Sequence, residues 1–573
     1  MTDAQAASAT RISIEKTEES MKPSNRIDPD NLVEPAEAAY AYPLLIKQLL
    51  HAAMAVSAEQ EIIYRDIKRY NYRTLSHRIG QLASALESIG VAPGQTVAMM
   101  DWDSHRYLES YFAVPMMGAV LMTVNARLSN EQVLYTINHS GAKVLIFNAE
   151  FIGVVEEIRD KLETVESYVF ISDQPGEALP SYCSAEYEAL LHEGSPHFEF
   201  PDFDENTIAT SFYTTGTTGL PKGVFFSHRQ LVLHTLATAS ALSSPQTQGR
   251  LHRDDVYMPI TPMFHVHAWG MPYIATMMGL RQVYPGRYTP EGLLRLVARE
   301  RVTFSHCVPT ILHMLLSNPA IGDTDVRGWK LIIGGSALPK GLAARAVEHG
   351  MDLFTGYGMS ETCPILTFAQ IKTALQGDRE RELEIRTKTG LPIPLVDLRI
   401  VDESMDDLPH DGKAAGEIVV RAPWLTQGYL KNPSASETLW AGGYLHTNDI
   451  GTIDPEGYVQ VTDRIKDVIK TGGEWVSSLA LEDIISRHAA VSEVAVIGVR
   501  DAKWGERPLA LVVLKSGATA SERELRDHVK RFVDEGEISK FAIPEQVKFV
   551  PAIEKTSVGK INKKGLREAY DPD

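Results

Sequence analysis

A short segment rich in threonine and glycine holds the side chains best suited to bind phosphate. Residues 214–223 read TTGTTGLPKG and contain four threonines, three glycines and one lysine. Glycines let backbone N–H groups approach an anion closely, threonine hydroxyls donate to phosphate oxygens, and the lysine adds a positive charge. The segment therefore predicts a site for a phosphorylated ligand, with these candidate contacts: Thr214, Thr215, Gly216, Thr217, Thr218, Gly219 and Lys222.

Two common nucleotide-binding motifs do not fit this chain. Pro221 stands where a Walker A loop needs glycine, and no GxGxxG sequence follows an expected strand. A Rossmann dinucleotide site is therefore not supported. A P-loop-like NTPase or phosphotransferase is the alternative from a different class, and it would need the Walker A loop and release ADP or phosphate.

Six further segments with candidate functional residues follow the loop along the chain. They read MFHVHAW (263–269), GGSAL (334–338), GYGMSET (356–362), TNDIG (447–451), DRIKDVIKTGGEW (463–475) and KTSVGK (555–560). Together with the loop they resemble the adenylate-forming superfamily of acyl-CoA synthetases, firefly-type luciferases and peptide-synthetase adenylation domains. The resemblance covers essentially the whole chain after about residue 40. Segments 389–402 and 469–483 are similar to the medium- and long-chain fatty acyl-CoA synthetase branch.

The resemblance implies a reaction in two steps. A carboxylate attacks the α-phosphate of ATP to give acyl-adenylate and pyrophosphate, and the thiol of CoA then displaces AMP. Because the first step brings an anion toward a polyanion, cations and oriented donors must lower its barrier. The alternatives within this class are a ligase for 3-methylthiopropionate or for an arylalkanoic acid. They stay open because the depth of the acyl pocket sets the chain length of the substrate, and the sequence does not give that depth.

Nucleotide contacts follow from the matching motifs. Tyr357 resembles the residue that stacks on adenine, with Gly335 and Ser336 on its other side. Asp449 resembles the carboxylate that accepts the ribose hydroxyls, and Arg464 lies near the ribose or phosphate. The further nucleotide contacts that the resemblance implies are Val266, Gly356, Gly358, Ser360, Lys466, Lys470 and Trp475.

Metal and catalytic roles follow in the same way. Glu361 resembles the family's Mg²⁺-binding glutamate and Thr214 its hydroxyl ligand, and hard oxygen ligands suit Mg²⁺. Lys560 resembles the lysine that attends adenylation, and His265 the residue that orients the carboxylate. The chain departs from the family at Glu554, where relatives usually have proline, which leaves the stiffness and charge of this loop open.

Two segments are expected to control access to the site. Trp269 resembles a gate at the mouth of a fatty-acid tunnel, with simple core packing as the alternative reading. Lys466 resembles the hinge between a large and a small domain. The small domain would first deliver Lys560 and then rotate to present Gly472 and Gly473 along the path of CoA.

Composition narrows the class of protein. Lys and Arg total 56 against 74 Asp and Glu, which gives a net charge of −18 and argues against a nucleic-acid or anionic-membrane protein. The three cysteines, Cys183, Cys307 and Cys363, form no CxxC pattern, which favours a reducing compartment. The N-terminal residues show no export signal, and the longest apolar stretch is too short to cross a bilayer. We therefore expect a cytoplasmic protein.

Apolar strands alternate with amphipathic helices from about residue 42, which predicts an α/β fold with parallel sheets. We expect a loose extension over 1–40, a large domain over 41–463 and a small domain over 464–573. The large domain would combine mixed and parallel sheets with a β-barrel-like subdomain, and the small domain would be a mobile α+β unit. The expected partners are ATP, CoA and a carboxylic acid, with Mg²⁺ as cofactor. Because some relatives are homodimers, a homodimer stays open.

Overall fold

The computed structural model describes residues 31–174, 176–214, 220–246, 248–471, 474–536, 538–555 and 561–571. By contact, the chain divides into one unit that ends at Pro43 and a second that begins at Leu44. Residues 32–42 are mostly exposed, and the second unit contains all the sheets that follow. The expected boundaries at 40/41 and 463/464 stay predictions.

The first sheet holds the threonine- and glycine-rich loop at its edge. Its seven strands run in the order β7-β6-β5-β3-β4-β8-β9, and all pairs are parallel except β8 with β9. Its strands are β3 (Thr96–Met100), β4 (Val120–Thr123), β5 (Ala142–Asn148), β6 (Ser167–Ile171), β7 (Ala185–Glu186), β8 (Ile208–Thr214) and β9 (Lys222–Ser227).

The second sheet has nine strands in the order β16-β15-β14-β13-β12-β10-β11-β1-β2. Its central strands are parallel, and the antiparallel pairs lie at its two ends. Its strands are β1 (Glu61–Tyr64), β2 (Lys68–Asn71), β10 (Val256–Pro259), β11 (Arg281–Tyr284), β12 (Phe304–Cys307), β13 (Lys330–Ile333), β14 (Asp352–Gly358), β15 (Ile365–Phe368) and β16 (Leu391–Pro392).

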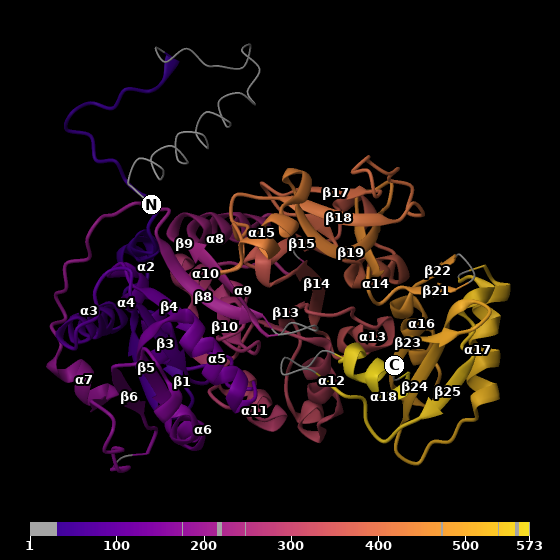
Figure 1. Ribbon diagram of the computed structural model, residues 1–573, viewed down its shortest axis with the longest axis horizontal. Helices are drawn as coiled ribbons and strands as arrows, with labels where there is room; N and C mark the ends of the chain where they lie inside the picture. The colour runs from indigo at the N-terminus through magenta and orange to yellow at the C-terminus, as the bar shows by residue number, and fades with distance from the viewer. Residues whose placement is uncertain are drawn as a thin grey trace, which may run out of the picture. The chain divides into compact units, whose positions relative to one another are not determined.

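The turn-rich segment after residue 388 forms an antiparallel sheet in the order β17-β18-β19-β20. The C-terminal sheet follows the order β22-β21-β24-β23, with β25 parallel to β24 (Figure 1). The strands are β17 (Asp397–Val401), β18 (Gly416–Arg421), β19 (Leu445–Ile453), β20 (Val459–Arg464), β21 (Ile469–Thr471), β22 (Glu474–Val476), β23 (Val491–Asp501), β24 (Gly505–Leu514) and β25 (Gln546–Phe549).

The helices pack against these sheets, and all residues of the helix His105–Met116 are buried. Ser227 and Gln230 form a capping box that starts α8 directly after β9, so the chain turns from strand to helix without a linker. The helices are α2 (Leu49–Val56), α3 (Tyr72–Ser88), α4 (His105–Met116), α5 (Asn130–Ser140), α6 (Ile152–Ile158), α7 (Tyr187–Glu193), α8 (His228–Ser243), α9 (Val266–Trp269), α10 (Met271–Met278), α11 (Pro290–Glu300), α12 (Pro309–Ser317), α13 (Lys340–Glu348), α14 (Arg379–Thr387), α15 (Pro433–Leu439), α16 (Ser478–Ser486), α17 (Glu522–Asp534) and α18 (Lys563–Tyr570).

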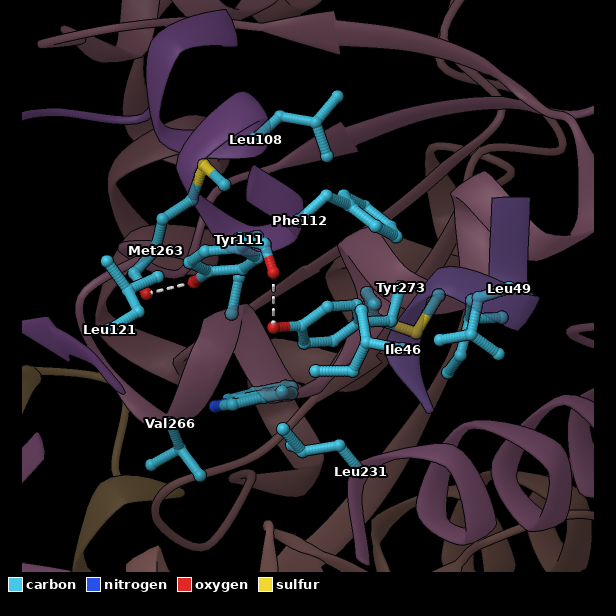
Figure 2. Packing of buried hydrophobic residues seen from close by; sticks show 14 of the residues in the cluster. Ile46, Leu49, Leu108, Tyr111, Phe112, Leu121, Leu231, Met263, Val266 and Tyr273 are labelled. Atoms are coloured by element: carbon cyan, nitrogen blue, oxygen red, sulfur yellow. Dashed lines mark hydrogen bonds between the residues drawn. The ribbon is translucent and has the colours of Figure 1, made fainter. Parts of the chain in front are cut away.

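The largest apolar cluster joins α4, α8 and α10 with the segment that leads into α9. Leu108, Phe112, Leu231 and Tyr273 are all buried in it, and Figure 2 shows their side chains around Tyr111 and Met263. The alternation of strand and helix, the large mixed sheets and the smaller C-terminal sheet confirm the α/β architecture expected from the sequence.

Candidate active site

The base of the threonine- and glycine-rich loop is a strand pair. Thr214 ends β8 and faces Lys222, the first residue of β9, across antiparallel register. The pairing fixes the two ends of the loop side by side, which is what a loop that wraps a ligand needs. The five predicted contacts between them, Thr215, Gly216, Thr217, Thr218 and Gly219, lie outside the described residues.

Three predicted nucleotide residues meet in one polar cluster at the carboxyl end of β14. The Tyr357 hydroxyl donates to Asp449 Oδ2 at 2.8 Å, and Arg464 Nε lies 3.3 Å from Asp449 Oδ1. Asp449 and Arg464 are cross-strand partners in β19 and β20. Burial and the neighbouring carboxylate raise the pKa of Tyr357, so its hydroxyl stays a donor. Because a carboxylate has about four acceptor positions, Asp449 keeps capacity for ribose hydroxyls.

A second cluster forms around Glu361, in the 3-10 turn η7 (Ser360–Thr362). Its side chain is buried, and Glu361 Oε1 accepts a hydrogen bond of 2.8 Å from the Tyr429 hydroxyl. Lys222 Nζ lies 4.5 Å from the centre of the Tyr429 ring. Burial raises the pKa of Glu361, while Tyr429 and the charge of Lys222 act in the opposite direction. A buried carboxylate with so few donors is well suited to a cation.

The glycines of the two central motifs let the backbone pack closely between these clusters. A Cβ on Gly334 would lie 2.7 Å from the Gly356 carbonyl oxygen and 3.0 Å from the indole of Trp269. A Cβ on Gly358 would overlap the Pro364 carbonyl. Larger residues would therefore push the motif strands apart. The remaining predicted contacts beside them, Gly335, Ser336 and Ser360, lie at the ends of β13 and β14 with exposed or half-buried positions.

These positions follow a general rule for parallel sheets. β13 and β14 are parallel neighbours, and the GGSAL and GYG motifs lie at their carboxyl ends. Ligands of open α/β sheets bind at this edge. The second sheet therefore brings together side chains that the sequence placed in separate motifs.

The MFHVHAW segment has an unusual backbone. Val266, His267, Ala268 and Trp269 have φ values of 47°, 54°, 47° and 60°, and Gly270 follows at 74°. The α9 segment is thus a left-handed turn built almost wholly from L-residues with side chains, at a cost of roughly 1–2 kcal/mol per residue. His265 is half-buried, whereas Val266 and Trp269 are buried.

The segment predicted to be the hinge follows β20. Arg567 of α18 donates to the Lys466 carbonyl oxygen at 2.9 Å and also binds Asp467. Burial and the charge of Arg464 lower the pKa of Lys466. The Lys470 backbone donates to Glu506 Oε2, and Lys470 pairs with Trp475 between β21 and β22. Gly472, Gly473, Lys560 and the side chain of Trp475 lie outside the described residues.

Two residues have surroundings that the spacing of the motifs does not indicate. Tyr429 binds Glu361 from a turn-rich segment 68 residues away, and no local spacing connects the two. His267, to which the motif assigns no role, is fully buried with both ring nitrogens unpaired. Its neighbours in the motif gave no signal of this environment, because the left-handed turn creates it.

Comparison with known proteins identifies the family. The AMP-binding enzyme family matches residues 50–430, and the AMP-binding enzyme C-terminal domain matches residues 480–560. A long-chain-fatty-acid–CoA ligase of Thermus thermophilus is 41% identical over 529 residues, which cover 91% of this chain and 94% of the relative. A 3-methylmercaptopropionyl-CoA ligase of Ruegeria lacuscaerulensis is 38% identical over 92% of this chain and 97% of the relative.

A solved structure agrees with the sequence comparisons. ATP-bound MatB from Rhodopseudomonas palustris superposes with a TM-score of 0.80 at 26% identity, over 93% of this chain and 99% of that chain. This chain therefore belongs to the AMP-binding enzyme family. It is an AMP-forming acid–CoA ligase of the fatty acyl-CoA synthetase branch: it activates a carboxylic acid as acyl-AMP and transfers the acyl group to CoA.

These findings confirm the resemblance, the reaction class and the three substrates ATP, CoA and an acid. Both the expected fatty-acid ligase and the 3-methylthio alternative are represented among the relatives. Within the described ranges, none of the helices has the length and apolar character that a membrane crossing requires.

Proposed function

We propose that the acid is a medium- or long-chain fatty acid and that Asp449, Glu361 and Lys560 divide the work of activating it. The observation that supports this proposal most directly is the pair of polar clusters around Tyr357 and Glu361, which lie four residues apart in one motif. One cluster suits a ribose and the other a cation with phosphates. The buried aromatic segment with Trp269 suits an apolar acyl chain.

The nucleotide would bind across the carboxyl edge of the second sheet. Tyr357 stacks on adenine, and Asp449 accepts the ribose hydroxyls beside its bonds to Tyr357 and Arg464. Glu361 and Thr214 would hold Mg²⁺, which neutralises phosphate charge during the attack. Lys222 and the loop hydroxyls bind phosphate oxygens. His265 orients the acid carboxylate, and Lys560 stabilises the charge that develops as the carboxylate attacks.

The small domain is proposed to move between the two steps, with Lys466 at the hinge and Gly472–Gly473 along the CoA path. We also propose that the enzyme is cytoplasmic and that it forms a homodimer. The three cysteines support the first of these proposals, because all are free thiols.

A panel of acids tests the substrate. Purified protein with ATP, Mg²⁺ and CoA should convert fatty acids to thioesters with AMP as the nucleotide product, and kcat/KM should be highest for a medium or long chain. Leaving out CoA should leave pyrophosphate release but no thioester. ADP as the product would overturn the proposed chemistry. A higher kcat/KM for 3-methylthiopropionate or 3-phenylpropionate would identify the alternative substrate.

Trp269→Ala tests the acyl site. The indole belongs to the large apolar cluster, lies 5.0 Å from the His306 ring, and would lie 3.0 Å from a Cβ added to Gly334 of the GGSAL motif. We expect the variant to change chain-length preference and the KM for the acid more than the KM for ATP. Trp329→Ala is the matched control, because Trp329 is equally buried in a separate apolar cluster. If Trp269→Ala only lowers stability, by the roughly 3–5 kcal/mol of a lost core aromatic, core packing is its whole role.

A further inference from the structure

The main chain just before His265 is held by side chains from other elements. Tyr111 of α4 donates to the Met263 carbonyl oxygen (Figure 2), and Thr123 of β4 donates to the Phe264 carbonyl oxygen at 2.9 Å. Both hydrogen bonds are buried, as are Met263 and Phe264 themselves. Because His265 follows directly, the positions of these two residues determine where its side chain starts.

Asp103 accepts a third hydrogen bond from the same segment. Its Oδ1 accepts from Met263 N at 2.7 Å, so Met263 is held at its N–H by Asp103 and at its carbonyl by Tyr111. The Asp103 carbonyl oxygen accepts from Gly286 N at 2.8 Å, which fixes the main chain that carries the carboxyl group. Asp103 is 3% exposed. Because a buried carboxylate costs free energy that a neutral acceptor does not, stability alone does not favour an acid at this position.

The groups around Asp103 bring its ionisation close to neutral pH. Burial raises the pKa of Asp103 to about 8, and the charge of Asp101 acts in the same direction. The Met263 N–H and the charge of Arg127 act in the opposite direction. The other charged or titratable groups nearby are Arg106 beside Asp101, His265 two residues beyond Met263, and five tyrosine hydroxyls that stay protonated because burial raises their pKa values: Tyr107, Tyr111, Tyr257, Tyr284 and Tyr288.

We propose that Asp103 is a positioning residue for the acid: its carboxyl group holds the Met263 N–H and thereby sets where His265 meets the carboxylate of the acid. An ionised carboxylate forms a shorter and stronger hydrogen bond with an N–H than a neutral acceptor does. The charged form of Asp103 therefore holds segment 263–265 in place, and proton uptake loosens it. This inference rests on the proposed role of His265.

The test compares the wild type with Asp103→Asn over about 1.5 pH units on either side of 8. The first half-reaction is followed alone, as the acid-dependent exchange of pyrophosphate into ATP, so that ionisation of the CoA thiol does not enter the profile. Asparagine keeps a neutral acceptor for Met263 but cannot ionise. The ratio of wild-type to variant kcat/KM for the acid should therefore rise about fivefold as Asp103 ionises, which corresponds to about 1 kcal/mol. The KM for ATP should be the same in both proteins. A ratio that does not change with pH overturns the inference.

Two further variants serve as controls. Thr123→Val removes the hydrogen bond to the Phe264 carbonyl without removing a titrating group, so its effect on kcat/KM for the acid should be the same at every pH. Asp101→Asn removes a charge that raises the pKa of Asp103, so the rise in kcat/KM should move to lower pH. A rise at an unchanged pH in Asp101→Asn would assign the titration to another group and overturn the inference.

The free energy of unfolding reports the ionisation of Asp103 without any measurement of activity. Because its pKa is raised in the folded protein, rising pH should lower the free energy of unfolding of the wild type relative to Asp103→Asn up to about pH 8 and no further. The same midpoint in unfolding and in exchange supports the inference. A difference in stability without a difference in exchange overturns it, and Asp103 would then be purely structural.

His265→Ala separates this inference from the proposed function, and all measurements use whichever acid of the panel gives the highest kcat/KM. In a His265→Ala background, Asp103→Asn should no longer change the pH profile. If His265→Ala alone leaves kcat/KM for the acid unchanged, the proposed role of His265 fails. If it lowers kcat/KM and Asp103→Asn still changes the profile, the role of His265 stands and positioning through Asp103 is refuted.

Discussion

Lys560→Ala is expected to slow acyl-adenylate formation by at least about 100-fold, roughly 3 kcal/mol, the scale of losing one preorganised charge-stabilising group. Thioester formation from supplied acyl-adenylate and CoA should stay nearly intact, because the second step does not bring an anion toward a polyanion. The two half-reactions are measured separately, the first by the release of pyrophosphate and the second by the formation of thioester.

The described residues on both sides of Lys560 are held in place by contacts with each other and with α16. Lys555 and Ile561 form a β-bridge, and Lys563 Nζ lies 2.6 Å from Ser478 Oγ and 2.8 Å from Glu482 Oε1. The base of the Lys560 loop is therefore tied to α16. Lys564→Ala is the charge-matched control, because Lys564 is exposed and forms an ion pair with Glu568 one helical turn along α18. It should leave both half-reactions unchanged.

Lys466→Pro should slow thioester formation and leave acyl-adenylate formation nearly intact. A fixed φ at the proposed hinge would hinder rotation of the small domain but leave accessible the orientation that delivers Lys560. Equal losses in both half-reactions, for either variant, would contradict the proposed alternation of the small domain. Lys560 would then be a general binding or structural residue.

Glu361→Gln is expected to lower kcat by about 100-fold or more, because an amide is a much poorer Mg²⁺ ligand than a carboxylate. The substitution should not lower the free energy of unfolding. The amide oxygen can still accept from Tyr429, and the substitution removes a buried charge. The variant and the wild type are compared by activity across Mg²⁺ concentrations and by thermal unfolding.

The pH dependence of stability gives this prediction a second readout. Burial raises the pKa of Glu361, so the folded protein holds its proton more tightly than the unfolded chain. Above the pKa that Glu361 has in the unfolded chain, rising pH therefore lowers the free energy of unfolding of the wild type, until Glu361 is ionised in the folded protein as well. The stability gain of Glu361→Gln should grow over the same range. A variant that loses stability together with activity would show that Glu361 is structural.

Much of the fold could be predicted because local patterns and tertiary structure agree. TVAMM, KVLIFN and VSEVAVIGVRD are buried strands, as their apolar runs predict, and SERELRDHVKRF forms α17 with a capping box at Ser521. The polar contacts of Asp449 with Tyr357 and Arg464 join residues that the resemblance had already grouped. The register of β19 with β20 brings two of them together.

What could not be predicted depends on contacts between distant segments. Tyr429 reaches Glu361 because segment 426–430 is hydrogen-bonded on two sides: Leu430 N donates to the Gly223 carbonyl oxygen of β9 at 2.8 Å, and Thr426 N donates to the Glu361 carbonyl oxygen at 2.9 Å. The left-handed turn could not be predicted either. Val266 and Ala268 have no intrinsic preference for positive φ, so the packing around His267 and the anchored residues before it must impose that conformation.

The position of α18 has a practical consequence for handling the enzyme. The last helix holds the Lys466–Asp467 turn through Arg567, and Asp571 at its end receives hydrogen bonds from Arg500. Residues up to Pro43, in contrast, form a unit of their own. An affinity handle or a surface attachment belongs at the amino end, because immobilisation through the carboxyl end would pull on α18 and so on the Lys466–Asp467 turn, which is the proposed hinge.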